Sequence, residues 1–192
     1  MLLDIKLGIL WALLVSLVFG EPITWEWFGA GILFALLPDL DFWIEYLKRG
    51  TVGGKKIGAH RTLFHTPLPY IPLALLIGFF CGPAWAALFC LGVFGHLIHD
   101  LVGMGFGIRL FWPFSSNFHK LMSDREGHIR YDLFPGHVSW TNEEVAAVAE
   151  VKGNENWIRE DIAYHLKHWP EHLLKFALLA LLVWIMLMFF NT

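Results

Sequence analysis

Five long apolar blocks constrain the fold of this chain more than any other feature of its sequence. A helix needs about twenty mostly apolar residues to cross the roughly 30 Å hydrocarbon core of a bilayer. Blocks near this length occur at 3–20, 24–47, 67–82, 83–103 and 172–190, and the first and third are short. The sequence CGP at 81–83 predicts a tight turn between the third and fourth blocks. We therefore expect an all-α, polytopic helical membrane protein with about five spans.

The polar residues are gathered mainly in one segment, 104–171, between the fourth and fifth blocks. With 192 residues in total, the chain is expected to form a single membrane domain over 1–192 that carries this segment as a cytoplasmic insertion. The first part of the insertion is rich in glycine and aromatic residues, which predicts irregular loops with short extended pieces. The stretch SWTNEEVAAVAEV predicts a helix that Gly153 ends, and NENWIREDIAYHLKHW predicts another that leads to the last span.

The basic residues indicate how the chain is oriented in the membrane. All 14 Lys and Arg residues fall at the amino end of the first span, between spans two and three, between spans four and five, or at the start of span five. These positions lie on one predicted side, which the positive-inside rule assigns to the cytoplasm. The amino terminus is therefore expected inside and the carboxyl terminus outside. The net charge of −3 gives no indication of a nucleic-acid partner.

The sequence GHLIHD, residues 95–100, places ionisable side chains inside the fourth apolar block. His96, His99 and Asp100 are spaced i, i+3, i+4, so they share one face of a helix. Ionisable groups at membrane depth are costly unless they face a cavity, a partner or a metal. We therefore expect these three residues to line a pore or to form a ligand cluster.

Other ionisable residues are predicted to lie at the same depth. Counted from the outer ends of their spans at 1.5 Å per residue, Asp39 lies about 21 Å deep and His96 about 20 Å deep. His60 and His65 come just before the third span, on the same face. Asp41 follows Asp39 by two residues, and the two side chains would diverge on a regular helix. Pro38 removes that objection because it interrupts the helix.

The clustered residue types suit a transition metal, although other interpretations remain open. Carboxylate oxygens with imidazole nitrogens suit zinc, manganese or iron better than calcium. The same residues would also serve a proton or ion pathway, although five spans without repeat symmetry argue against an ordinary secondary transporter. In the simplest alternative, the histidines bind backbone carbonyls and the aspartates cap helices.

Four motifs give the chain a family resemblance: LPDLD at 37–41, HRTLFHT at 60–66, GHLIHD at 95–100 and FWP at 111–113. Their order and spacing resemble the YdjM-like family of membrane-bound metal-dependent hydrolases, some of which are described as LexA-binding inner-membrane proteins. The residues on the family's pattern positions are Asp39, Asp41, His60, Arg61, His65, His96 and Asp100. His99 is additional to the pattern. Family members often carry a histidine near the amino terminus, where this chain offers only Asp4, so either Asp4 takes that place or the ligand set differs by one residue.

The resemblance implies a metal-dependent hydrolase that faces the cytoplasm from the bacterial inner membrane. The expected ligands of one or two zinc, manganese or iron ions are Asp39, Asp41, His65, His96 and Asp100, with His60 as a further ligand or a neighbour of the ligands. Arg61 is expected to hold an anionic headgroup or to anchor the cytoplasmic face. His99 is expected to act as a general base or to hydrogen-bond a ligand. The expected reaction is cleavage of an ester or phosphoester by a metal-activated water.

The expected depth of the site favours a lipid or lipid-linked substrate, and membrane lipid is the one partner that the sequence indicates. The loop RLFWPF at 109–114 is expected to anchor the chain at the interface or to form a substrate lid. The stripe of His165, His168 and His172 is interpreted as an amphipathic interfacial face. Two other functions stay open: a scaffold or regulator that holds a structural metal and binds a partner through 104–171, and a proton or ion conductor.

Overall fold

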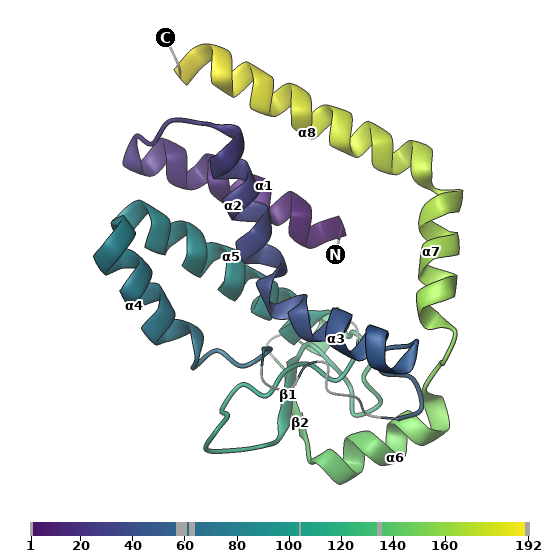
Figure 1. The fold of residues 1–192 in the computed structure, drawn as a ribbon. Helices are drawn as coiled ribbons and strands as arrows, with labels where there is room; N and C mark the ends of the chain where they lie inside the picture. Colours follow the sequence, from purple (N-terminus) through teal and green to yellow (C-terminus); the bar gives the residue numbers. More distant parts are fainter. Residues whose placement is uncertain (1, 57–60, 62–63, 104, 134–135, 191–192) are drawn as a thin grey trace.

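The computed structural model describes residues 2–56, 61, 64–103, 105–133 and 136–190, and these residues are mostly helical (Figure 1). Helix α1 (Leu2–Phe19) is followed by α2 (Trp25–Leu36), the 3-10 turn η1 (Leu37–Asp39) and α3 (Leu40–Arg49). After a loop come α4 (Tyr70–Cys81) and α5 (Pro83–Val102). The insertion contains β1 (Phe118–Leu121), the short turn η2 (Tyr131–Leu133), β2 (His137–Trp140), α6 (Asn142–Lys152) and α7 (Trp157–Lys167), and α8 (Trp169–Phe190) follows it.

The helix boundaries follow from local sequence signals. The Thr24 side chain accepts a hydrogen bond from the backbone N–H of Trp27, which caps α2. Gly82, with a φ of +96°, separates α4 from α5, and Pro83 begins α5, so the predicted turn at 81–83 is confirmed. Pro38 lies in η1, between α2 and α3, and the predicted interruption of this helix is also confirmed.

Three elements are long and apolar enough to cross a membrane in the described part of the chain: Leu2–Phe19, Trp25–Arg49 and Pro83–Val102. They correspond to three of the predicted spans. The predicted span at 67–82 contains α4, whose 12 residues reach only about 18 Å. The predicted span at 172–190 lies in α8, which has 22 residues. A helical membrane protein is thus confirmed, whereas the count of five spans stays a prediction.

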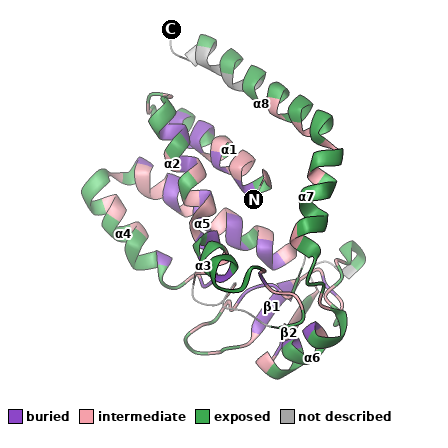
Figure 2. Ribbon diagram, turned by 45° about the vertical axis from the view of Figure 1, so that its right-hand side comes forward, coloured by how far each residue is buried: buried purple, intermediate pink, exposed green. Residues whose placement is uncertain are grey.

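The helices pack around α5, which contacts α1, α2 and α4. The buried core includes Ala12, Leu13, Trp27 and Leu88, and the indole N–H of Trp27 donates to the carbonyl of Ala12 (2.8 Å). Figure 2 shows buried residues along α1, α2 and α5, whereas α4, α7 and the described side chains of α8 are largely exposed. The exposed apolar surfaces of α4 and α8 suit a lipid environment, in which apolar surface need not be buried in protein.

Helices α1 and α2 approach each other through two glycines. A Cβ atom added to Gly31 would lie 2.4 Å from the carbonyl oxygen of Gly8, and one added to Gly8 would lie 2.6 Å from the carbonyl oxygen of Gly31. Small residues at such crossings let two helix backbones come close together. This contact fixes the position of α1, whose first turn carries Asp4.

In the insertion, β1 and β2 form an antiparallel two-stranded sheet, with Phe118 opposite Trp140. The protein is therefore not purely α, and the expected short extended pieces pair as strands. Helix α6 begins with a capping box formed by Thr141 and Glu144, and Gly153 follows its last residue, as the sequence predicted.

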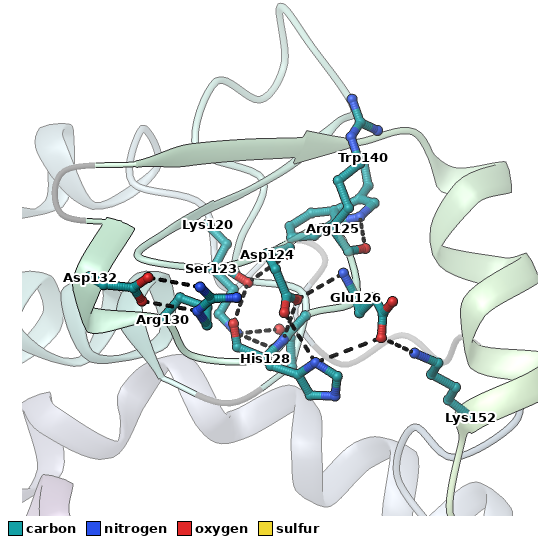
Figure 3. Close-up of polar contacts among 12 residues, drawn as sticks. Lys120, Ser123, Asp124, Arg125, Glu126, His128, Arg130, Asp132, Trp140 and Lys152 are labelled. Atoms are coloured by element: carbon teal, nitrogen blue, oxygen red, sulfur yellow. Dashed lines mark hydrogen bonds and ion pairs between the residues drawn. The ribbon is translucent and has the colours of Figure 1, made fainter.

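Lys120 of β1 is fully buried and ties the loops of the insertion together (Figure 3). Its ammonium donates to the carbonyls of Gly105 (2.8 Å) and Gly127 (2.7 Å). Burial, with a smaller effect from the charge of Arg61, lowers the pKa of Lys120 to about 8. The Asp124 carboxylate accepts from two backbone N–H groups in the same loop, those of Glu126 and His128. This network holds the loop at 105 beside Arg61.

Candidate metal centre

Seven ionisable side chains from separate elements meet at one end of the helix bundle. They come from α1 (Asp4), η1 (Asp39), α3 (Asp41), the turn before α4 (His65) and α5 (His96, His99 and Asp100). The turn is held in place because the Tyr70 hydroxyl donates to the carbonyl of Phe64 (2.7 Å). The predicted convergence of Asp39, His65 and His96 is confirmed, since one ligand atom from each lies within 4.8 Å of the others.

Asp39, His65 and His96 have the spacing of a metal ligand set, and Asp100 lies beside the two histidines. Oδ1 of Asp39 lies 3.6 Å from Nε2 of both His65 and His96. Oδ2 of Asp100 lies 3.2 Å from Nε2 of His65 and 3.6 Å from Nε2 of His96. Zinc ligands at about 2.0–2.1 Å in tetrahedral geometry are separated from one another by roughly 3.4 Å. Each carboxylate oxygen therefore lies close to the separation from the two imidazole nitrogens that such an ion requires, and Asp39, His65 and His96 form the set whose ligand atoms all lie within 4.8 Å of one another.

The other nitrogen of each histidine faces a second carboxylate. Nδ1 of His96 lies 2.8 Å from the carbonyl oxygen of Ala35 and 3.3 Å from Oδ1 of Asp4. Nδ1 of His65 lies 3.4 Å from Oδ2 of Asp41. Acceptors at Nδ1 favour the tautomer in which Nδ1 carries the proton, which leaves the Nε2 lone pair for a metal. Asp4 and Asp41 thus orient the two imidazoles.

The four central side chains of the cluster are largely buried. His65, His96, Asp39 and Asp100 expose 0%, 3%, 8% and 6% of their surface. Within the described residues, Nε2 of His96 and Oδ2 of Asp100 are buried and lack a hydrogen-bond partner of good geometry. Unsatisfied buried polar atoms of this kind are costly, and a metal bound between them would satisfy both. The residues present therefore fit a divalent metal.

His65 shows the same preference for positive charge. Burial alone would lower its pKa, but hydrogen bonds to Asp100, Asp39 and Asp41 outweigh that effect and raise the pKa to about 10. Three carboxylates around one imidazole thus stabilise a cation at this point, whether a proton or a metal. Metal binding is consequently expected to compete with protons.

The remaining predicted residues lie around this centre. Asp41 is placed at the Nδ1 side of His65, and its predicted role as a ligand stays untested. Arg61 has a φ of +63°, in the left-handed region, and donates to Oδ1 of Asp100 (2.8 Å). Nδ1 of His99 lies 3.2 Å from Oδ1 of Asp4. His60, a predicted ligand or neighbour, lies outside the described residues.

A cavity of about 650 Å³ adjoins the centre. Asp39, Arg61, His96, His99 and Asp100 line it, so the cluster is connected to a space that a ligand can occupy. The opposite side is formed by α3 and α7, and the sequence analysis did not associate α7 with the site. His165 also lines the cavity, although it was interpreted as part of an interfacial stripe. No local pattern in the sequence indicates that α7 folds back over the centre.

Fold and site together define the class: a helical membrane protein whose spans enclose a histidine–aspartate cluster with the geometry of a metal centre. Comparison with protein families identifies the particular group, because the model described as YdjM inner membrane protein matches residues 5–192. The chain belongs to this family, which confirms the resemblance that its motifs predicted. No curated protein and no solved structure matches the chain.

The orienting role of the two outer carboxylates can be measured. Replacing Asp4 or Asp41 by asparagine should weaken metal binding roughly 10- to 100-fold, because partners of this kind fix the tautomer and raise the basicity of the ligating histidine. Competition with a chromophoric chelator measures the affinity. Asp161→Asn is the matched control, because Asp161 lines the same cavity with a half-exposed side chain and does not face either ligand histidine in the described contacts. Equal affinity in all three variants would contradict the assignment.

Proposed function

We propose that this protein is a metal-dependent hydrolase of the cytoplasmic membrane that cleaves an ester or phosphoester. The observation that carries the proposal is the set of four converging atoms from Asp39, His65, His96 and Asp100 at the edge of a cavity. A site of this kind has both a place for a metal and an open side for a substrate. Two imidazoles and two carboxylates suit zinc, manganese or iron.

A bound divalent ion supplies a nucleophilic water at neutral pH and polarises the scissile oxygen. His99 is suited to move the proton, because it lines the cavity while its Nδ1 faces Asp4. A proton on Nδ1, which faces the buried Asp4 carboxylate, leaves Nε2 as the basic atom. Arg61 also lines the cavity, where a guanidinium suits an anionic oxygen of a phosphoester.

We further propose that the amino terminus and the site face the cytoplasm. The positive-inside asymmetry of the 14 basic residues supports this orientation. The arrangement in Figure 1 is consistent with it, because the amino terminus, the end of α3, the sheet and α6 lie toward one end of the molecule, away from the turns that join α1 to α2 and α4 to α5. Membership of an inner-membrane family supports the membrane location itself.

The proposal is tested with purified protein loaded in turn with zinc, manganese or iron and given water-soluble chromogenic esters and phosphodiesters. The His99→Gln variant should keep its metal and lose roughly 100- to 10,000-fold in kcat, the usual contribution of a general base. His168→Gln is the control, because His168 does not line the cavity and its Nδ1 faces the carbonyl of Tyr164 at the end of α7. A loaded wild-type protein that is no faster than free metal, or a His99→Gln variant with full kcat, would overturn the proposal.

A further inference from the structure

The cavity beside the metal centre has two chemically different parts. Its floor is polar and holds the ligand cluster, Arg61 and His99. Its walls are mainly apolar and aromatic: they are formed by Leu2 and Leu3 of α1, Phe42, Trp43 and Tyr46 of α3, and Trp157, Ile158 and Ile162 of α7, and α7 adds the polar side chains of Asp161 and His165. A polar floor with apolar walls suits a ligand that is itself divided into a polar head and an apolar chain.

Helix α7 is fixed in place as one wall of this cavity. The indole N–H of Trp157 donates to the carbonyl of Val52 (2.6 Å), and the ring of Trp157 contacts that of Phe42 edge to face, with 6.3 Å between ring centroids. Just before α7, a carboxylate oxygen of Glu155 accepts from the backbone N–H of Lys55 (2.8 Å). These contacts join α7 to α3 and to the loop after it, so the space between the two helices is built into the fold.

The walls keep apolar surface exposed inside this space. None of the residues of α7 is buried. Trp43 is 48% exposed and Ile162 is 53% exposed, although both line the cavity. Apolar surface that faces a hollow next to polar groups marks a ligand-binding groove. The volume of about 650 Å³ lies within the range of about 300–1,000 Å³ found for small-molecule sites.

We propose that the space between α3 and α7 binds the apolar chain of an amphiphilic phosphoester whose head lies on the metal centre. This inference rests on the proposed function for the position of the head, but the chain site stands on the cavity walls alone. An anionic head suits the floor, because Arg61 and a bound metal are both positive there. Each methylene that enters an apolar site gains about 0.8 kcal/mol, which corresponds to an approximately fourfold increase in affinity.

Binding of alkyl phosphonates of four, eight and twelve carbons to the metal-loaded protein tests the chain site. In the wild type, affinity should rise about fourfold per methylene until the chain fills the cavity. Ile162→Glu places a charge in the apolar wall and should flatten this dependence on chain length. Leu166→Glu is the matched control, because Leu166 is 68% exposed on the same helix and does not line the cavity. A flat dependence in the wild type, or equal losses in both variants, would overturn the inference.

The position of the chain is read by photo-crosslinking with a dodecyl phosphonate that carries a terminal diazirine. Label should appear in the α3 and α7 peptides and disappear from them in Ile162→Glu. Label spread evenly over the exposed faces of α4 and α8 would overturn the inference. The two proposals fail separately: labelled α3 and α7 without any turnover contradicts the hydrolase, whereas turnover with a flat chain dependence contradicts only the chain site.

Discussion

Replacing His96 by glutamine should remove the metal from this protein, and replacing Asp39 by asparagine should do the same. Wild-type protein purified in detergent is expected to hold about one ion of zinc, manganese or iron per chain, as four ligand atoms at this spacing would require. His96→Gln removes a ligand nitrogen, Asp39→Asn removes the negative charge of a ligand oxygen, and the two residues come from different helices. The loss of affinity should exceed the roughly 100-fold that partners outside the ligand set contribute. Mass spectrometry of the metal content makes the measurement.

The control for this experiment is His128→Gln, because His128 has a 63% exposed side chain in the insertion and pairs only with neighbouring acids of its own loop in the described contacts. Full metal in the control and none in the two variants would join η1 and α5 in one site. A folded wild-type protein that holds no metal even after reloading would contradict both the metal centre and the hydrolase. The cluster would then be better explained as a proton pathway or as part of a scaffold.

Replacing Gly31 by valine should destabilise the fold and weaken the metal centre together. The valine side chain at position 31 would clash with the backbone of Gly8, and that backbone cannot move away without separating α1 from α2. Overpacking of this kind costs about 3 kcal/mol when a backbone must shift. Helix α1 carries Asp4 and α2 leads into Asp39, so the separation should also displace an orienting group and a ligand.

Gly29→Val provides the comparison, because a Cβ atom at Gly29 meets nothing within 4 Å on the same helix. This control should change stability by about 0.5 kcal/mol or less. Thermal unfolding in detergent, followed by size-exclusion chromatography, gives the stability, and the chelator competition gives the metal affinity. Equal melting temperatures for the two valine variants would show that the helix crossing does not depend on the glycine contact.

The sequence predicted those parts of the fold and site that follow local rules. The turn at 81–83 and the break at Pro38 come from the restricted backbone of glycine and proline. The shared face of His96 and Asp100 follows from helical periodicity, and their depth from the rise per residue. The convergence of Asp39 with His96 was predictable because both lie a similar distance from the outer ends of their predicted spans.

Features that depend on packing between distant segments were not predictable in the same way. Asp4 is a single acid at the start of an apolar helix, and its contacts with His96 and His99 arise only when α1 crosses α5. The orientation of Asp41 toward the outer nitrogen of His65 depends on how η1 turns the chain after Pro38. Likewise, nothing local to 157–167 indicates that α7 closes one side of the cavity.

The order of the ligands along the chain has a consequence for how the protein is made. Asp39 belongs to the second predicted span, which is synthesised before His65, His96 and Asp100. A lone aspartate at a helix centre opposes membrane insertion by up to about 3 kcal/mol. We therefore expect the Asp39 carboxylate to stay hydrated or protonated until α5, which carries the imidazole of His96, has been inserted. Assembly of the cluster is thus a late step of biogenesis, because a chain that lacks α5 also lacks His96 and Asp100.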